Sequence, residues 1–240
     1  MAESTYPNGL PHPPQALRNR IAIELGVLAV LTPSFLMFAP PIVHNNIMYV
    51  GLALFGFVLV QLNARETRER IWGPPNSPPF DRVRRCAINM SLLTIPPVLL
   101  FFILGVVGRT WKPWWMPWLE DGCPMFSLNF FAALCMYLPW ALLQQTLFQF
   151  YLLGRLRALL PFASPLLLSV LNGCAYGLVH FQKPPVMVVT IIGGIFWSYS
   201  YHRDRYVIPI AISHALLGTT FYYWIYNHDL VEEVIRVMQN

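Results

Sequence analysis

The stretch LPWALLQQTLFQFYLLGRLR, residues 138–157, decides how this sequence is interpreted. It is apolar enough to lie in a bilayer, yet it carries Gln144, Gln145 and Gln149. Gln145 and Gln149 share one face of a helix, while Gln144 points about 100° away from them. Amide groups at membrane depth must find hydrogen-bond partners in protein or water, because lipid offers none. We therefore predict a polar wedge that faces the interior of a helical membrane protein.

The composition of the whole chain indicates the same class. Hydrophobic residues make up 56% of the 240 residues, charged residues only 11%, and the mean hydropathy is +0.49. A soluble domain carries roughly 25% charged residues. We predict an all-α, polytopic integral membrane protein. The net charge of +5 is unevenly spread and indicates loop orientation, so we expect no nucleic acid among its partners.

Seven apolar stretches are candidates for transmembrane helices, which need roughly 20 residues to cross a bilayer. They cover residues 21–41, 47–62, 86–107, 126–153, 160–181, 186–201 and 207–226. The fifth and sixth are short for a full crossing, so we expect them to be tilted or partly re-entrant. We predict one transmembrane domain over residues 21–226, without an internal repeat.

Arginines mark the cytoplasmic side of this predicted bundle, because basic residues concentrate in cytoplasmic loops. They gather in the 63–85 loop, at Arg155 and Arg157, and in the segment His202–Arg205. Residues 1–20 are therefore predicted to be a cytoplasmic tail. Residues 227–240 then form an amphipathic C-terminal tail on the other side of the membrane.

Two segments outside the predicted spans are candidate surfaces for partners. The 109–124 loop holds four tryptophans within eight residues. Tryptophan suits the lipid headgroup layer and is also common at protein interfaces, so both interpretations stay open. The 227–240 tail offers an apolar helix face. We predict membrane lipid and other integral membrane proteins as partners, the latter through one of these two segments.

Two later spans also carry polar residues at membrane depth. Asn172, Tyr176 and His180 follow each other at four-residue steps, which predicts one polar line along one helix face. His214 lies on the last span. Interhelical hydrogen bonding that only stabilises packing is one interpretation of these residues, and a retained polar site is the other.

The order and spacing of these residues resemble the CPBP family of intramembrane peptidases. That family includes the type II CAAX prenyl endopeptidases and the bacteriocin-processing, Abi-type proteins, and it carries Glu-Glu-x-x-x-Arg, Phe-x-x-x-His and His-x-x-x-Asn on successive spans. This chain has QQTLFQ at residues 144–149, YGLVH at 176–180 and HALLG at 214–218. The resemblance covers about residues 125–226 and implies a helical membrane core, which we expect in a bacterial inner (plasma) membrane.

The resemblance implies a set of site residues by position. Gln144, Gln145, His180 and His214 stand at the family's catalytic positions, with Gln149, Tyr176 and Gly218 at supporting positions. In the family, the first glutamate is thought to activate water, the histidines to orient it, and the asparagine to complete the oxyanion site. Gln144 has no carboxylate to accept a proton. Gly218 supplies no oxyanion donor, a loss of about 3 kcal/mol where such donors have been removed.

These departures predict a pseudoenzyme, a catalytically degenerate CPBP-like protein that acts as a non-catalytic subunit or assembly factor of a membrane complex. The alternative is a CAAX-type or bacteriocin-type intramembrane endopeptidase in which His180 and His214 activate water without a carboxylate. A third interpretation places haem or a transition metal on these two histidines, since neutral imidazole suits both. No carboxylate or thiolate is placed to join them, so we expect no cofactor.

Overall fold

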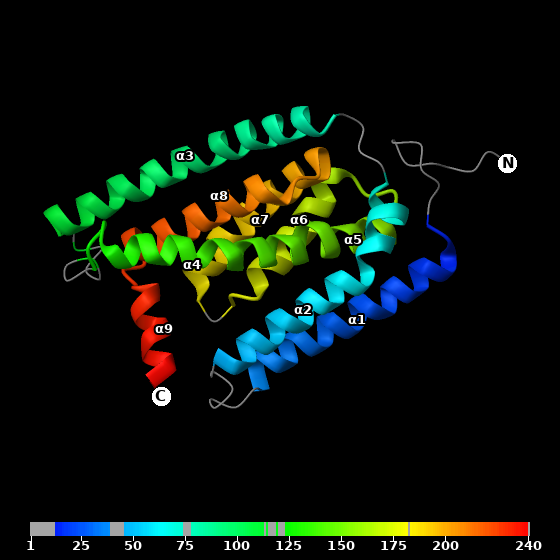
Figure 1. Ribbon diagram of the computed structural model, residues 1–240, viewed down its shortest axis with the longest axis horizontal. Coiled ribbons are helices and arrows are strands. Elements are labelled where there is room, and N and C mark those ends of the chain that lie inside the picture. Colours follow the sequence, from blue (N-terminus) through cyan, green and yellow to red (C-terminus); the bar gives the residue numbers. More distant parts are fainter. Residues whose placement is uncertain are drawn as a thin grey trace. The chain divides into compact units, whose positions relative to one another are not determined.

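The computed structural model describes residues 13–38, 46–73, 78–112, 114, 119, 123–181 and 183–239 (Figure 1). These residues form helices and no strand, which confirms the all-α prediction. The chain divides into two compact units. Unit 1 contains Met1–Val83 and Gln145–Val207, and unit 2 contains Arg84–Gln144 and Ile208–Asn240.

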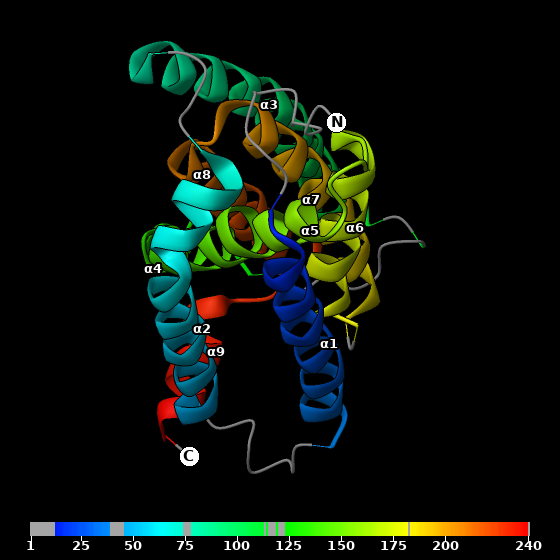
Figure 2. The same ribbon diagram turned by 90° about the vertical axis from the view of Figure 1, so that its right-hand side faces the viewer.

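Unit 1 contains helices from two separate parts of the chain, one N-terminal and one that begins at Gln145. They are α1 (Gln15–Phe38), α2 (Asn46–Glu66), η2 (Thr67–Trp72), η4 (Thr146–Leu152), α5 (Leu153–Leu159), α6 (Pro165–Leu178) and α7 (Pro184–Asp204). Helix α1 packs on α5, whereas α2 packs on η4. Figure 2 shows α1 and α2 as separate helices. The segment from η4 to α5 is therefore the element on which the N-terminal helices of this unit meet.

Helices α6 and α7 form the most closely packed pair of unit 1. Glycines permit this approach, because side chains at their positions would collide with the facing backbone. A Cβ on Gly173 would lie 2.6 Å from the backbone nitrogen of Ile195, and one on Gly177 would lie 2.9 Å from the Met187 carbonyl. The pair brings polar side chains of both helices within hydrogen-bonding distance.

Helix α6 is shorter than the 160–181 span predicted from the sequence. Ser164 caps its N-terminus by accepting from the Leu167 amide, and Pro165 occupies the first turn. Its 14 residues extend about 21 Å, less than the ~30 Å of a hydrocarbon core. The helix ends at Leu178 in a turn that includes His180, and Pro184 and Pro185 open the next helix.

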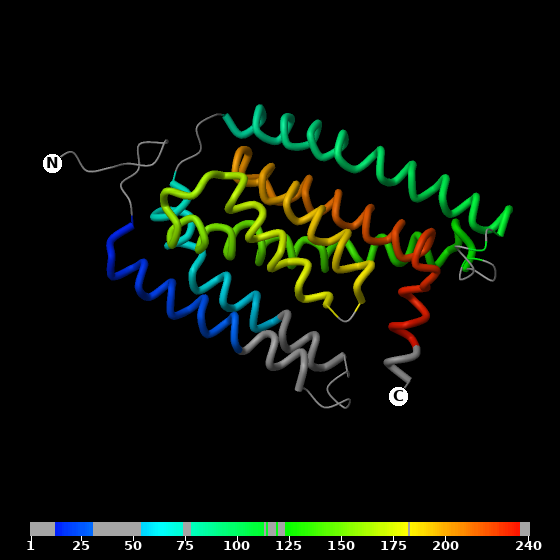
Figure 3. The backbone as a smooth tube through the Cα atoms, turned by 180° about the vertical axis from the view of Figure 1, so that it is seen from behind, coloured from blue at the N-terminus to red at the C-terminus, as the bar shows by residue number. Residues whose placement is uncertain are grey.

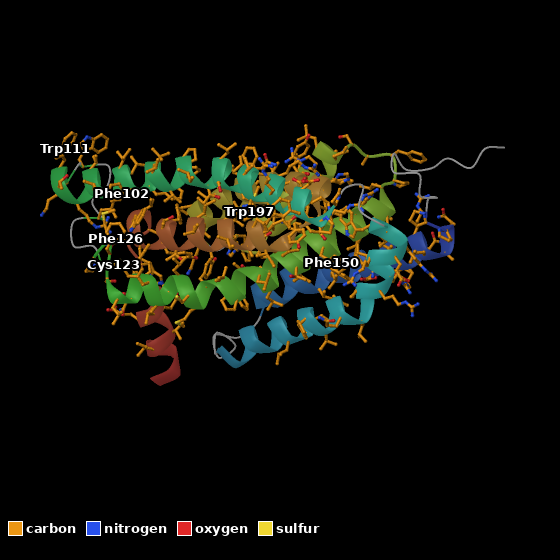
Figure 4. The ribbon with its side chains drawn as sticks, turned by 45° about the horizontal axis from the view of Figure 1, so that its top comes forward. Phe102, Trp111, Cys123, Phe126, Phe150 and Trp197 are labelled. Atoms are coloured by element: carbon orange, nitrogen blue, oxygen red, sulfur yellow. The ribbon has the colours of Figure 1, made fainter. Side chains whose placement is uncertain are left out.

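Unit 2 contains most of α3 (Pro79–Trp111), α4 (Leu128–Gln145) and α8 (Val207–Thr220), together with η5 (Phe221–Ile225) and α9 (Leu230–Gln239). Its aromatic core includes Phe130, Tyr223 and Trp224. The guanidinium of Arg109 donates to four backbone carbonyls, those of Gly105, Cys123, Tyr223 and Trp224. Arg109 thereby joins three parts of unit 2, namely α3, the residues that precede α4, and η5. Figure 4 shows Phe102, Cys123 and Phe126 at this end of the unit.

Helices α4, η4 and α5 form one continuous run, which Figure 3 follows as a single tube. This run, Leu128–Leu159, and Pro79–Trp111 are the two helices within the described residues that are long and apolar enough to cross a membrane. Pro165–Leu178 is a shorter apolar helix. Seven spans, a cytoplasmic N-terminus and the domain boundaries stay predictions. Helix α9 forms where an amphipathic tail is predicted, while half of the 109–124 loop lies outside the described residues.

Candidate functional site

Two glutamines of the stretch 138–157 are hydrogen-bonded to each other inside unit 1. Gln149 Nε2 donates to Gln145 Oε1 at 3.0 Å, and both side chains are fully buried. Gln145 Nε2 in turn donates to the hydroxyl of Tyr176 at 3.4 Å. Three residues that the sequence assigns to the site therefore lie together, and the predicted interior-facing polar wedge holds for Gln145 and Gln149.

Helices α6 and α7 extend this network. Asn172 Nδ2 donates to Gln149 Oε1 at 3.1 Å and to Ser198 Oγ at 2.8 Å. Ser198 Oγ donates to the Gly194 carbonyl at 2.6 Å. Asn172 and Ser198 are both fully buried. We call the linked side chains of Tyr176, Gln145, Gln149, Asn172 and Ser198 the amide network. Ser198 is the member that the sequence analysis missed, and its only signal is a small polar residue one turn after a glycine.

Gln149 of this network lies in η4, which is a π-helical segment. A π-helical turn breaks the regular hydrogen-bond ladder and often marks a functional site. The carbonyl of Phe150 in η4 accepts a hydrogen bond from the indole Nε1 of Trp72 at 2.9 Å, and Phe150 is labelled in Figure 4. A Cβ on Gly154 would lie 2.9 Å from the same indole nitrogen. Trp72 therefore fixes the helix segment that follows the glutamines, provided that position 154 is glycine.

His180 does not lie on the helix face predicted for it. Helix α6 ends at Leu178, Val179 is its C-cap, and His180 follows in a turn whose amide donates to the Gly177 carbonyl. The half-buried imidazole lies with its ring centre 6.5 Å from that of Tyr176. The continuous polar line of the sequence analysis thus holds for Asn172 and Tyr176, and is wrong at its last member.

The second histidine lies in unit 2 beside a tyrosine. His214 is nearly buried, and its Nε2 lies 3.3 Å from the hydroxyl oxygen of Tyr137 on α4. Thr94 on α3 donates to Ser213 at 2.6 Å, which fixes the register of α8 next to His214. The sequence analysis missed Tyr137, because it belongs to none of the three motifs.

Tyr137 also explains the glycine one turn after His214. A Cβ on Gly218 would lie 2.4 Å from Tyr137 Cε1 and 3.2 Å from its hydroxyl oxygen. Any side chain at position 218 requires the tyrosine ring to move, including the asparagine of the family pattern. The ring of Tyr137 occupies the space beside His214 that such an asparagine would use.

The family-equivalent positions are divided between the two units. Gln145 and His180 belong to unit 1, whereas Gln144 and His214 belong to unit 2. Gln144 is half-buried. Within the described part of the chain, no group of three or more His, Cys, Asp or Glu side chains is placed to hold a metal ion.

A comparison with family models identifies the core of the chain. The model described as type II CAAX prenyl endopeptidase Rce1-like matches residues 126–220. Neither the comparison with curated proteins nor that with solved structures found a match. The matched range contains all three motif segments and agrees with the core predicted at about residues 125–226. Residues 126–220 are thus similar to the type II CAAX prenyl endopeptidase Rce1-like family, which supports the CPBP resemblance of the motifs.

Proposed function

We propose that this chain is a catalytically degenerate CPBP-like protein that acts as a non-catalytic subunit or assembly factor of a membrane complex. The observation that carries the proposal is the hydrogen bond from Gln149 to Gln145 inside a fully buried network. We place the protein in a bacterial inner (plasma) membrane.

The neutral pair at positions 145 and 149 replaces the second glutamate and the arginine of the family motif. A buried glutamate or arginine without its partner would cost several kcal/mol, because the remaining charge would lie in a medium of low dielectric. Loss of both charges leaves two amides that still bond to each other and to Asn172 and Tyr176. An amide has no basic lone pair with which to accept a proton from water. The arrangement supports a role in holding helices together.

The environment of His214 supports the same conclusion. The family's asparagine position is Gly218, and the adjacent space is filled by Tyr137. Residues of the family's oxyanion site are thus replaced by a packed aromatic ring. These two departures on different helices support the proposal that the family mechanism is lost.

The surfaces that we propose for partners lie outside the family core. Trp111 and Trp114 are 79% and 89% exposed, so the described part of the 109–124 loop presents large aromatic side chains. Helix α9 packs Leu230 and Val231 on the core of unit 2, while Ile235 stays 43% exposed. We propose that other integral membrane proteins bind one of these segments.

The catalytic half of the proposal is tested by peptide cleavage. The purified chain is incubated with a panel of prenylated and leader peptides beside the His180→Ala, His214→Ala variant. We expect equal, background cleavage by both proteins, since Gln144 and Gln145 stand where the family has its two glutamates. Turnover by the native chain that the variant lacks would establish the endopeptidase instead.

The partner half is tested by purification from native membranes in mild detergent, followed by crosslinking. We expect a defined complex that is weakened by Trp111→Ala with Trp114→Ala and unaffected by Phe162→Ala, an equally exposed aromatic residue elsewhere. A chain that extracts only as a monomer would contradict the subunit role.

One observation favours the alternative of a retained endopeptidase. The hydroxyl of Tyr137 lies within hydrogen-bonding distance of His214 and could supply a donor where the asparagine is missing. The same cleavage assay decides this alternative when Tyr137→Phe is added to the panel. Turnover that depends on both His214 and the Tyr137 hydroxyl would support it.

A further inference from the structure

Two arginine side chains of unit 1 lie against the ring of Trp72. Its indole is 3% exposed, and the guanidinium carbons of Arg157 and Arg205 lie 5.1 Å and 5.5 Å from its ring centre. Arg157 is itself only 5% exposed. Two arginines are therefore held at one aromatic ring, although like charges repel and burial strengthens the repulsion.

Arg205 is fixed in position by backbone groups. It ends α7 in the left-handed conformation, with a φ of 54°. Its Nη1 donates to the carbonyl of Trp72 at 2.6 Å and to that of Gly73 at 3.1 Å. Burial, and next the charge of Arg157, lower the pKa of Arg205 to about 10. The group is still a cation at neutral pH, and it lies where a further negative charge would be favourable.

Arg82 brings a third guanidinium to the same place. Its Nη1 donates to the Asp204 carbonyl at 3.5 Å, and its guanidinium carbon lies 5.9 Å from the ring centre of Tyr206. Arg82 therefore contacts both chain neighbours of Arg205. The carboxylate of this segment, Asp204, is fully buried and forms a salt bridge with Arg203 at 3.0 Å. Arg82 and Arg205 are both half-buried, so each side chain is partly accessible to solvent.

We propose that Arg82 and Arg205 bind the phosphate of an anionic phospholipid headgroup, with Arg157 and Trp72 behind them. Planar guanidinium groups match phosphate oxygens in pairs, which makes arginine the favoured phosphate ligand. Arginines of this kind belong at the membrane surface, where the cytoplasmic leaflet carries the anionic lipids. The positive charge of the three arginines thus favours anionic over zwitterionic phospholipids. This proposed lipid site does not depend on whether the chain cleaves peptides.

The inference is tested by lipid binding to the full-length chain in detergent. Phosphatidylglycerol and phosphatidylcholine are titrated separately, and binding is measured by native mass spectrometry and by the shift in thermal unfolding. We expect the native chain to prefer phosphatidylglycerol, and the preference to fall as salt rises. Each arginine removed should weaken binding about fivefold, the value of one basic side chain near an anionic surface.

The test variant is Arg82→Gln with Arg205→Gln, and Arg82→Lys with Arg205→Lys retains the charge. Arg65→Gln is the matched control, since Arg65 is an exposed arginine whose partner is Glu69. The glutamine variant should lose the preference, the lysine variant should keep much of it, and the control should equal the native chain.

Two measurements on the native chain stand independently of how the variants fold. Equal binding of the two lipids by the native chain would overturn the proposal. Displacement of phosphatidylglycerol by millimolar inorganic phosphate would also overturn it, because the ligand would then be free phosphate and not a lipid.

Discussion

Tyr137 occupies the space that a side chain at position 218 would need, since a Cβ on Gly218 would lie 2.4 Å from Tyr137 Cε1. The tyrosine and the glycine are therefore a matched pair across α4 and α8. We predict that Gly218→Asn destabilises the protein by about 1–3 kcal/mol through overpacking. Tyr137→Ala should recover part of that loss when combined with it, whereas it should cost stability alone. Thermal unfolding of the four proteins measures the coupling, and strictly additive effects would show that the two residues do not compete for space.

We expect the hydroxyl of Tyr137 to contribute to the stability of the protein separately from its ring. Tyr137→Phe keeps the ring but removes the hydrogen bond to His214, so we predict a loss of about 1 kcal/mol in the free energy of unfolding. Tyr199→Phe serves as control because Tyr199 is 48% exposed, and it should be near neutral. Equal unfolding temperatures for both variants would show that the hydrogen bond to His214 adds no stability.

Charged substitutions at the buried residues Gln145 and Gln149 should have coupled effects on the stability of the protein. We predict that Gln145→Glu destabilises the protein by about 3 kcal/mol, because it buries an uncompensated carboxylate. Gln149→Arg added to it should restore about 2 kcal/mol, since the two charges then neutralise each other. Gln144→Glu, at a half-buried position, should cost less. Denaturant unfolding of the double-mutant cycle checks this, and a double variant less stable than either single variant would contradict it.

Arg109 should be essential for the stability of the end of unit 2 that contains η5. Arg109→Lys leaves a charge in place but cannot reach the four carbonyls that the guanidinium joins, so we predict a loss of about 2 kcal/mol or more. Amide exchange of η5 should accelerate in the same variant. Arg84→Gln is the control, because Arg84 is exposed on the same helix. Unchanged exchange in η5 would mean that the aromatic core alone holds this end.

The docking of α9 should depend on pH through Asp229. Burial alone would raise the pKa of Asp229, but hydrogen bonds from Tyr223, Asn129 and the backbone amides of Glu232 and Val231 outweigh it and lower that pKa. A carboxyl group whose pKa is lower in the folded state stabilises the fold above its unfolded value of about 3.9. That stability is lost as the pH falls below this value.

We therefore predict that α9 undocks in acid, below about pH 4. Amide exchange of α9 between pH 6 and pH 3 measures this, after correction for intrinsic exchange rates. Asp229→Asn should weaken docking at pH 6 and remove most of the pH dependence. An equally steep acid response in Asp229→Asn would assign the transition to other groups, such as Glu232 or Glu233.

Much of the helical framework follows from the sequence. The predicted span 47–62 lies within α2, and 86–107 lies within α3. Apolar runs and basic loops are local signals, so they locate helices without knowledge of the contacts. The span 160–181 was too long, because hydropathy does not register the cap at Ser164 or the break before Pro184.

The sequence by itself determined the all-α class of the protein and its resemblance to the CPBP family, because composition, helical spacing and the order of three motifs are properties of the chain alone. Only the tertiary structure decided what those motifs contact. Tyr137 and His214 are 77 positions apart, and Asn172 and Ser198 are 26 apart. Such pairs form only when helices pack, and no local pattern records which side chains will meet. The packing shows Gln145 and Gln149 of residues 138–157 in hydrogen bonds that need no charge.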